Sequence, residues 1–587
     1  MAFLGVERSA KEFTWVERPA DPNLIQRLRA ESAVDELRAQ LLASRGITPE
    51  ALDAFMRPRL RDLLPDPSDL KGFHEFESAF FSAHQAGERI GILADYDVDG
   101  ATSAAVLVAF LRALGLSFEL YVPDRLNEGY GPSDEAFDHF TRLGITTVIT
   151  LDCGSMAHGP LHRAESKGIR VLVIDHHLID GAPPSVTAHI NPNQSGCISG
   201  IGTCAAVGVC FTVIIGLRRS ARQRDIACEL DLMLLLDLVA LGTVCDVVPL
   251  KGLNRAFVLQ GLKVWPQSIN PGLRALTDVL PKKPVFDGSL AGFQIGPRLN
   301  AAGRIGPSDM AARILTRKDE KEAKRLAQEL DRLNQQRRDI ESQVLSEARL
   351  ALRDQSQDSP INLVVNPSWH PGVVGIVAGR LKDSTGKPSI VLGGQAGEEA
   401  LSGSGRSVPG FDLGAAVLSL RGQGLLLSGG GHAMAAGLKL MPNQLEAVRE
   451  GLARLIARSP SSELSVKKRP IDIAIRPSAA TFQLAQFLTS LQPFGSENPE
   501  PKVAVTDLRV EFMTTVGKNH LKLRLSDGAG SKLSAIAFRA AGTSMEMCFR
   551  QGRDQLIHVV GTLAVDDWAS GEASQLLVED VALSGTN

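Results

Sequence analysis

The chain has 587 residues, 44% of them apolar and 22% charged, and a formal net charge of −3 at pH 7. This length predicts about two to four domains. The charge gives no basic signature, and seven cysteines without a CxxC pair argue against a zinc ribbon or a disulfide framework. The richest apolar stretch, 232–250, is interrupted by Asp237 and Asp246 and predicts a buried helix, so we expect a cytoplasmic protein with no membrane partner.

Residues 1–72 are predicted to form an N-terminal helical segment that ends in the proline-rich RDLLPDPSDL. Over 73–316, Val/Ile/Leu strands such as GILA, TTVIT and RVLVI alternate with helices. Strands that are apolar at every position indicate a parallel sheet covered on both faces. We therefore expect an α/β domain with a parallel sheet in this region.

Residues 317–353 contain no Gly or Pro and predict one long connecting helix, which we interpret as a solvated spacer between two domains. A second α/β domain is expected over 354–460. Residues 466–587 contain short alternating strands such as HLKLRLSD and KLSAIAFR, which predict a small β-barrel of the OB kind. Phe512 and Phe538 in this region could stack on bases or belong to its core.

Polar side chains follow all three predicted strands of the first α/β domain. Ligands of parallel α/β sheets bind beyond the carboxyl ends of the strands, so we expect these side chains to meet at one edge. A lone aspartate after a strand is more often a helix cap, but three strands and a helix together argue against caps alone. The residues are Asp95, Asp97 and Asp99 after GILA, Asp152 after TTVIT, Asp175, His176 and His177 after RVLVI, and Asp246 after the helix DLVALGTVC.

Several carboxylates with one or two imidazoles and no thiolate favour Mn²⁺ or Mg²⁺ over structural Zn²⁺. The carboxylates are too numerous for one ion, so we expect two ions that share a bridging carboxylate. Without cations these aspartates would raise one another's pKa. Cys153 and Cys245 adjoin two of the candidate ligands, and we interpret them as small buried apolar residues.

The motifs DYDVDGATSAA, LDCGS, VIDHH and ALGTVCDVVPL resemble, in this order, the four motifs of the DHH phosphoesterase superfamily. Downstream, GPRLNAAGRIG, WHPGVVGIVAGRL, SGSGRS and GGGHAMAAG resemble the RecJ branch, the single-strand-specific 5′→3′ DNA exonucleases, and its DHH-associated domain. LQPFGSENPEP resembles the segment that leads into the RecJ OB domain. The resemblance covers most of the chain after about residue 70 and is carried by specific motifs.

The resemblance implies a set of metal ligands that also carry the catalysis. His177 would face the scissile phosphate, and Asp175 would orient an imidazole from behind. Asp95 stands where relatives carry Asp or His, and it is included among the ligands. The implied ligands are Asp95, Asp97, Asp99, Asp152, His176 and Asp246.

Glycine-rich segments supply the candidates for binding the substrate phosphates. SGSGRS could be a backbone-rich phosphate loop or a flexible turn. GGGH is predicted to precede a helix, whose N-terminus favours an anion. The candidate residues are Arg298, Asn300 and Arg304 in GPRLNAAGR, His370 in WHPGVV, Ser404, Arg406 and Ser407 in SGSGRS, and His432 in GGGH.

The resemblance implies a single-stranded-DNA-specific 5′→3′ exonuclease that releases 5′-mononucleotides by two-metal hydrolysis, in DNA recombination and repair. Single-stranded DNA would be the substrate, and a helicase or a single-strand-binding protein would be a partner. Two alternatives remain open. A smaller DHH relative would hydrolyse pyrophosphate, a bisphosphorylated nucleotide or very short oligonucleotides, but the predicted C-terminal barrel argues against it. A catalytically idle nucleic-acid-binding relative would have lost aspartates that this sequence retains.

Overall fold

The computed structural model describes residues 2–125, 127–353, 359–394, 397, 399–458, 467–566 and 571–585. The chain divides into two compact units, and one of the boundaries between them, at Leu330/Asp331, lies inside a long helix. Unit 1 comprises Met1–Gly303, Pro307–Leu330 and Arg469–Asn587, and unit 2 comprises Arg304–Gly306 and Asp331–Lys468. The expected domain limits at 354, 460 and 466 lie outside the described residues.

Unit 1 contains the predicted parallel sheet, with five strands in the order β3-β2-β4-β5-β6. Every residue of β2 and β4 is buried, which explains why these strands are apolar throughout. Helices α7 and α8 pack on one side through residues such as Phe140 and Leu161. The bounds are β2 Ile90–Ala94, β3 Phe118–Tyr121, β4 Thr147–Leu151, β5 Arg170–Ile174, β6 Ala188–Ile190, α5 Phe73–Gln85, α6 Val98–Ala113, α7 Asp134–Arg142, α8 His158–Ser166 and α9 Ala206–Gln223.

A helical layer follows the sheet in sequence. The predicted buried helix at 232–250 is a short 3₁₀ turn, Leu232–Leu235, followed by α10, and Asp237 is fully buried in it. In the described part of the chain, no helix is long and apolar enough to cross a membrane. The bounds are α10 Leu236–Cys245, α11 Gly252–Val264, α12 Pro271–Asp278, the π-helix η5 Leu290–Ile295, α13 Gly296–Ile305 and α14 Met310–Thr316.

The C-terminal region forms the predicted small barrel. Strands β14, β15, β16, β18 and β17 pair in this order, and β17 also pairs with β14, which closes the barrel. Inward positions alternate with exposed ones along β15 and β16, as expected for a barrel wall. The bounds are β12 Lys468–Ile471, β13 Ile473–Ile475, β14 Val503–Val516, β15 His520–Ser526, β16 Lys532–Ala537, β17 Ile557–Val565, β18 Ser574–Leu583, α19 Phe482–Ser490 and α20 Ser544–Gln551.

The N-terminal segment is mostly helical, and it packs on the barrel at the other end of the chain. Strand β1 pairs with β12, and the fully buried Trp15 donates from Nε1 to Oδ2 of Asp580 at 3.1 Å. Leu28 and Leu41 belong to the same apolar cluster as the barrel core. The bounds are β1 Thr14–Glu17, α1 Pro22–Ser32, α2 Glu36–Ala43, α3 Pro49–Met56 and α4 Leu60–Leu63.

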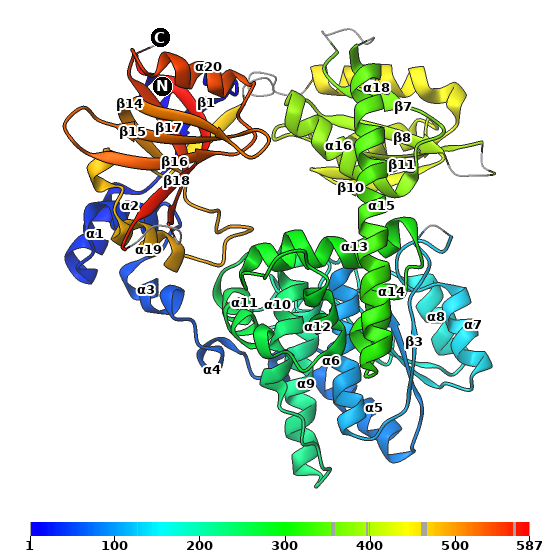
Figure 1. The fold of residues 1–587 in the computed structure, drawn as a ribbon. Coiled ribbons are helices and arrows are strands. Elements are labelled where there is room, and N and C mark those ends of the chain that lie inside the picture. The colour runs from blue at the N-terminus through cyan, green and yellow to red at the C-terminus, as the bar shows by residue number, and fades with distance from the viewer. Residues whose placement is uncertain are drawn as a thin grey trace. The chain divides into compact units, whose positions relative to one another are not determined.

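Unit 2 holds a second α/β fold around a five-stranded sheet of order β10-β11-β9-β8-β7 (Figure 1). β7 and β8 are parallel, and the other pairs are antiparallel. The bounds are β7 Asn362–Val365, β8 Ser389–Gly394, β9 Leu401–Arg406, β10 Ser428–His432, β11 Ala435–Leu440, α16 Pro371–Thr385, α17 Leu413–Gly422 and α18 Leu445–Ala457.

The long helix α15, Glu320–Arg353, is separate from α14 and is not solvated on all sides. Leu326, Leu330 and Val344 are buried on one stripe, at the spacing of helical turns. Within unit 2, Arg337 and Glu341 form an ion pair at 2.6 Å with both side chains almost covered. The interpretation of this helix as a solvated spacer is therefore wrong, because its apolar stripe packs into both units.

Candidate metal centre

The first acidic motif combines a helix cap with a cluster of carboxylates. Asp97 caps α6, and its Oδ1 accepts from the backbone N–H groups of Asp99 at 2.8 Å and Gly100 at 3.0 Å. A Cβ at Gly100 would lie 2.4 Å from the carbonyl oxygen of Asp95, so only glycine fits there. Asp99 is buried, and its oxygens accept from the amides of Ala206 at 2.6 Å and Val207 at 2.9 Å at the start of α9.

The backbone adopts a left-handed conformation at Asp152 and directly after Asp246. Asp152 follows β4 with a φ of 60°, in the left-handed region that L residues seldom adopt. The hydroxyl of Tyr130 donates to its carbonyl at 2.9 Å. Asp246 ends α10, and Val247 after it has a φ of 61°. Strained conformations of this kind cluster at functional sites, where the surrounding structure enforces them.

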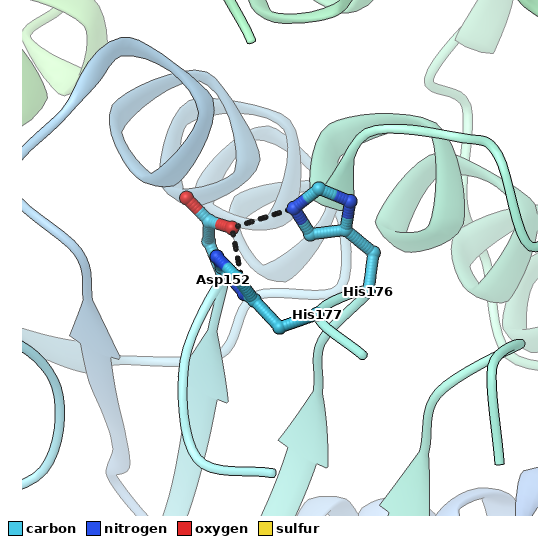
Figure 2. Close-up of side chains that lie close together, drawn as sticks. All are labelled: Asp152, His176 and His177. Atoms are coloured by element: carbon cyan, nitrogen blue, oxygen red, sulfur yellow. Dashed lines mark ion pairs between the residues drawn. The ribbon is translucent and has the colours of Figure 1, made fainter. Parts of the chain in front are cut away.

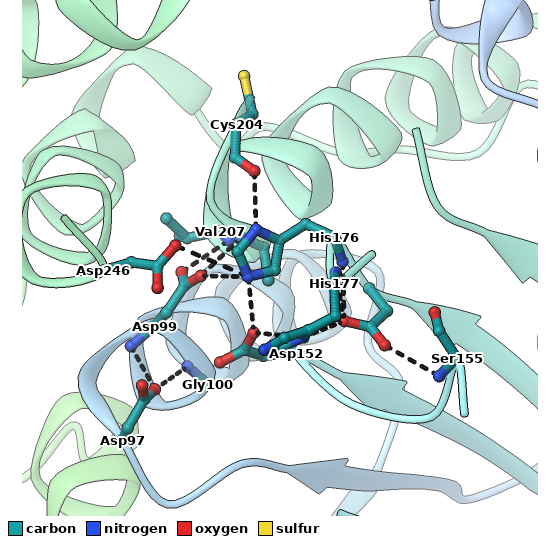
Figure 3. Close-up of polar contacts among 12 residues, drawn as sticks. Asp97, Asp99, Gly100, Asp152, Ser155, His176, His177, Cys204, Val207 and Asp246 are labelled. Carbon is teal, nitrogen blue, oxygen red and sulfur yellow. Dashed lines mark hydrogen bonds and ion pairs between the residues drawn. The ribbon is translucent and has the colours of Figure 1, made fainter. Parts of the chain in front are cut away.

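Figure 3 shows His176 and His177 beside Asp152. Asp175 organises these two histidines. Its Oδ1 accepts from the amides of His176 at 2.8 Å and His177 at 3.2 Å, and from Nδ1 of His177 at 2.8 Å. Its Oδ2 accepts from the amide of Ser155 at 2.9 Å. Although burial opposes ionisation, these hydrogen bonds hold the pKa of Asp175 below its usual range. The imidazole that Asp175 orients is therefore that of His177.

His176 is oriented from its other side. Its Nδ1 lies 3.0 Å from the carbonyl oxygen of Cys204, and since a carbonyl only accepts, this nitrogen carries the proton. Burial lowers the pKa of His176, which leaves a lone pair on Nε2. That atom lies 3.3 Å from Oδ1 of Asp152, 3.6 Å from Oδ2 of Asp246 and 3.9 Å from Oδ2 of Asp99.

Figure 2 shows Asp152 facing the imidazoles of both His176 and His177. Its Oδ1 is 3.9 Å from Nδ1 of His177. Three overlapping groups have ligand atoms close enough together to hold a cation. They are Asp152, His176 and His177; Asp99, His176 and Asp246; and Asp95, Asp97 and Asp152.

Four buried atoms of this cluster have no hydrogen-bond partner among the described residues: Oδ1 of Asp95, Oδ1 of Asp152, Nε2 of His176 and Oδ2 of Asp246. Buried polar atoms are nearly always satisfied, so such a group of orphaned lone pairs requires an explanation. Oxygen and imidazole donors without a thiolate suit a hard divalent cation such as Mn²⁺ or Mg²⁺. The residues present therefore fit the metal site expected from the sequence.

The electrostatics agree with this fit. Burial, together with the charge of Asp97, raises the pKa of Asp95 and of Asp246 to about 7. Burial and neighbouring carboxylates raise the pKa of Asp99 and Asp152 well above its ordinary value. The pKa of His177 is raised: burial lowers it, but the hydrogen bond and charge of Asp175 outweigh that effect. Because these carboxyl groups resist ionisation in the absence of metal, bound cations would stabilise their ionised forms strongly.

Sequence reasoning missed several residues beside this cluster. The hydroxyl oxygen of Tyr130 lies 3.1 Å from Nδ1 of His177. The guanidinium of Arg125 lies 5.0 Å from the ring centre of Tyr96. Arg125 and Tyr130 both follow β3 in the sequence DRLNEGYG, and the polar residues after this strand were the available signal. Cys153 is fully buried and burial raises its pKa, in agreement with its interpretation as a small apolar residue.

Helix α13 lies against the backbone next to two of the aspartates. A Cβ at Gly296 would lie 2.5 Å from Sγ of Cys245, and one at Gly303 would lie 3.6 Å from the carbonyl oxygen of Tyr96. The small residues of GPRLNAAGR therefore allow close packing near the cluster. Arg298 on this helix is largely buried, and its Nη1 donates to the carbonyl of Gln294 at 2.8 Å. Asn300 is partly exposed on the same helix.

SGSGRS is neither a loop nor a turn, because Leu401–Arg406 forms strand β9 between β8 and β11. A Cβ at Gly403 would lie 2.4 Å from Leu392, and one at Gly405 would lie 2.6 Å from Leu413. The glycines therefore face the core, and the alternate residues face the opposite side of the sheet. Both sequence interpretations of this segment were wrong, since glycine here serves close packing within a strand.

On that opposite side, four candidates surround the start of α16. His370 caps the helix, with Nδ1 accepting from the amide of Gly372 at 3.0 Å, and Nη1 of Arg304 lies 3.3 Å from the carbonyl of Gly372. A Cβ at Gly375 would lie 2.9 Å from Oγ of Ser404 and 3.3 Å from Nη2 of Arg406. Unit 2 thus brings Arg304, His370, Ser404 and Arg406 together at a helix N-terminus.

The two other candidates of unit 2 differ from expectation. Ser407 is buried, and its hydroxyl donates to the carbonyl of Phe411 at 2.7 Å, so it fixes the chain and does not face a groove. His432 is exposed at the end of β10, and a turn to β11 follows it. The helix predicted after GGGH is therefore absent, because residues 435–439 of β11 pair with β10 as a hairpin.

The barrel carries aromatic and basic side chains on one exposed surface. Phe512 is 52% exposed and Phe538 is 56% exposed, so neither is a core residue. Phe512 on β14 lies opposite Arg524 on β15, and Lys522 lies opposite Ile536 on β16. We call this surface, made of Lys522, Arg524, Phe512, Ile536 and Phe538, the barrel face.

Comparisons with known proteins agree with the geometry. Family models match at 89–243 (DHH family, N-terminal domain), 358–458 (DHHA1 domain) and 471–580 (RecJ OB domain). The chain is 34% identical to the single-stranded-DNA-specific exonuclease RecJ of Salmonella typhimurium over 96% of this chain and 97% of the relative. The RecJ of Bacillus subtilis is 32% identical over 98% of this chain and 71% of the relative.

Solved structures give the same result. The crystal structure of RecJ in complex with Mn²⁺ from Thermus thermophilus has a TM-score of 0.78 and 28% identity, and the match covers 97% of this chain and 78% of that one. An exonuclease RecJ bound to manganese has a TM-score of 0.58 and 32% identity, and covers 67% of this chain and 98% of that one. The chain belongs to the RecJ family of single-stranded-DNA-specific exonucleases.

Proposed function

We propose that the chain is a 5′→3′ exodeoxyribonuclease that degrades single-stranded DNA with two divalent cations, Mn²⁺ or Mg²⁺, and acts in DNA recombination and repair. The observation that carries this proposal is the convergence of four buried, orphaned donor atoms from Asp95, Asp152, His176 and Asp246. It is supported by relatives named single-stranded-DNA-specific exonuclease over nearly the whole chain.

Asp99, His176 and Asp246 would hold one cation, and Asp95, Asp97 and Asp152 the other, as their proximity suggests. Asp152 would bridge the two, since its Oδ1 also lies 3.3 Å from Nε2 of His176. When bound, the cations would lower the pKa of the attacking water and neutralise charge on the phosphate.

The protein's own residues would position the reactants. His177 is 44% exposed at its side chain and is held by Asp175, and its raised pKa favours the protonated form. It would then donate a hydrogen bond to an oxygen of the scissile phosphate, where charge develops. Attack on the phosphate between the first and second nucleotides would expel the 3′-oxygen of the first. The product would be a 5′-mononucleotide and a strand with a new 5′-phosphate.

Two other surfaces would hold the strand. The barrel face offers aromatic rings for stacking and basic groups for phosphates, which suits single strands of any sequence. In unit 2, Arg304, His370, Ser404 and Arg406 at the start of α16 would bind a terminal phosphate, because a helix N-terminus favours anions. Arg298 and Asn300 on α13 would contact the sugar-phosphate backbone of the DNA strand near the cations. A helicase or a single-strand-binding protein would act as a partner by presenting the single strand.

The substrate class can be tested with purified protein and Mn²⁺ or Mg²⁺. Hydrolysis should be compared on a long single strand, the same sequence as a blunt duplex, a dinucleotide and inorganic pyrophosphate. The proposal expects the long single strand to give by far the highest kcat/KM. A preference for pyrophosphate or the dinucleotide would favour a small-substrate phosphoesterase, and binding of the single strand without any hydrolysis would indicate an idle relative.

A further inference from the structure

The residues after β6 form a second polar motif at the edge where the other strands end. In the sequence INPNQ, Asn191 is completely buried and Asn193 is partly buried. Nδ2 of Asn191 donates to the carbonyl of His177 at 2.9 Å and to Oγ of Ser155 at 2.8 Å. Nδ2 of Asn193 donates to the carbonyl of His176 at 2.5 Å and to that of Gly202 at 3.0 Å.

These contacts complete the hydrogen bonding of the His176–His177 backbone. β5 ends at Ile174, so these two residues lie outside the strand. Both of their amides donate to Oδ1 of Asp175, and their carbonyls accept from Asn193 and Asn191. Side chains therefore satisfy all four backbone groups that a sheet would otherwise pair.

The two asparagines also support each other and the neighbouring strand end. Oδ1 of Asn191 accepts from the amide of Asn193 at 2.8 Å. Oγ of Ser155 lies 3.0 Å from Nε2 of His189, and Ser155 is buried, so this pair is part of the frame and not an exposed nucleophile with its base. The frame thus connects the end of β4, the DHH motif after β5 and the loop after β6.

We infer that Asn191 and Asn193 are positioning residues that fix the DHH histidines through their backbone carbonyls, Asn193 for His176 and Asn191 for His177. The inference rests on the proposed function, in which His176 binds a cation and His177 faces the scissile phosphate. Each backbone carbonyl accepts a hydrogen bond from an asparagine amide group. Aspartate is the informative replacement because its carboxylate cannot donate this hydrogen bond. Asp has the same shape as Asn but would place oxygen against the carbonyl oxygen.

The two replacements should have different kinetic signatures. Asn193→Asp removes the hydrogen bond to the carbonyl of His176, so that the backbone of His176 is no longer held in place. This variant should therefore need a higher Mn²⁺ concentration for half-maximal activity, and saturating Mn²⁺ should restore much of the rate. Asn191→Asp removes the hydrogen bond to the carbonyl of His177, so it should lower kcat, and additional Mn²⁺ should not restore kcat. Residues behind metal ligands typically contribute about 10- to 100-fold, which sets the expected size of both effects.

Asn498→Asp is a matched control in the barrel. Asn498 is also buried, and its Nδ2 donates to two backbone carbonyls, those of Leu491 at 2.9 Å and Pro493 at 2.8 Å. Its replacement breaks the same type of contact in a region without candidate metal ligands. Any effect on general stability should therefore appear in Asn498→Asp as well, whereas effects on the histidines should not.

The experiment measures Mn²⁺ binding by calorimetry, single-strand cleavage against Mn²⁺ concentration, and thermal unfolding, for the full chain and the three variants. The inference expects weaker Mn²⁺ binding in Asn193→Asp, a lower kcat in Asn191→Asp and neither change in Asn498→Asp. If Asn193→Asp does not fold, Asn193→Ser removes the same amide without adding charge and takes its place. Equal kinetics in all three variants, or losses that only follow the unfolding temperature, would overturn the inference. Wild-type protein that neither binds Mn²⁺ nor cleaves DNA would instead overturn the proposed function.

Discussion

Nε2 of His176 and Oδ1 of Asp152 lie 3.3 Å apart, and neither atom has a hydrogen-bond partner within the described ranges. The proton of His176 is on Nδ1, which donates to Cys204, so two lone pairs face each other. Such a pair is unfavourable unless a proton or a cation lies between the two atoms. This arrangement therefore lowers the stability of the metal-free protein.

Replacing Asp152 with Asn should separate stability from activity. Asp152→Asn puts a neutral amide in place of a buried carboxyl group whose ionisation is opposed by burial and by neighbouring carboxylates, so the metal-free variant should unfold at a higher temperature than wild type at pH 8. It should lose cleavage by about 100-fold or more, because even residues behind ligands contribute about 10- to 100-fold. Asp237→Asn is the matched control, since Asp237 is equally buried on α10 and is not in the cluster. Unfolding with and without Mn²⁺, together with cleavage rates, checks this; a metal-free Asp152→Asn that is less stable than wild type, or one that cleaves at the wild-type rate, would contradict it.

The pKa values predict how metal binding depends on pH. The pKa of Asp95 and Asp246 is about 7 in the folded protein and about 3.9 in an unfolded chain. Between these values the folded state binds more protons, so stability of the metal-free protein should fall as pH rises from about 4 to about 7.

Cations displace these protons, so Mn²⁺ affinity should be higher at pH 8 than at pH 6, and binding near pH 6.5 should release protons. Calorimetry in two buffers of different ionisation enthalpy measures the release. Mn²⁺ affinity that is constant from pH 6 to pH 8 would show that the carboxylates are already ionised.

The contact between α6 and α10 should be sensitive to a single methyl group. A Cβ at Gly242 would lie 2.3 Å from Oγ1 of Thr102 and 3.1 Å from Oδ1 of Asp99. Gly242→Ala should therefore reduce stability by about 1–3 kcal/mol and weaken Mn²⁺ binding by displacing Asp99. Gly422→Ala at the end of α17 is the control, because a Cβ there meets nothing within 4 Å. Denaturant unfolding and Mn²⁺ titration test both; a neutral Gly242→Ala would refute the steric argument.

The barrel face should contribute affinity and not chemistry. Phe512→Ala should weaken binding of a long single strand by about 1–3 kcal/mol, the usual value of one stacked base, and leave kcat on a short oligonucleotide unchanged. Met547→Ala is the control, since Met547 is also exposed in this domain but lies on α20. Fluorescence anisotropy at several salt concentrations measures the affinities. Equal affinities of the two variants would exclude the barrel face as the binding surface.

The convergence of the polar side chains at one edge of the sheet could be predicted because its signal is local. Asp95, Asp152 and Asp175 each follow an apolar strand directly, and parallel strands bring their ends to one edge. The asparagines after β6 belong to the same pattern, but β6 has only three residues, and its loop gave no comparable signal.

Other features depend on contacts that a linear pattern does not contain. Trp15 bonds to Asp580 across almost the whole chain, so the N-terminal segment gave no sign of its place on the barrel. Gly403 and Gly405 resemble a loop in the sequence because glycine is common in turns, whereas the packing of Leu392 and Leu413 makes them a strand. In both cases tertiary packing, and not the local preference of the sequence, determines the structure.

Cleavage of end-labelled single strands tests the central proposal most directly. Linear single strands labelled at the 5′ or the 3′ end, and a closed single-stranded circle, should be incubated with the full chain and Mn²⁺, with excess chelator as the control. We expect the 5′ label to be released first as a mononucleotide, the 3′ label to persist until the strand is short, and the circle to remain intact. Chelator should stop the reaction. Cutting of the circle, stepwise loss from the 3′ end, or full activity in chelator would contradict a metal-dependent 5′→3′ exonuclease.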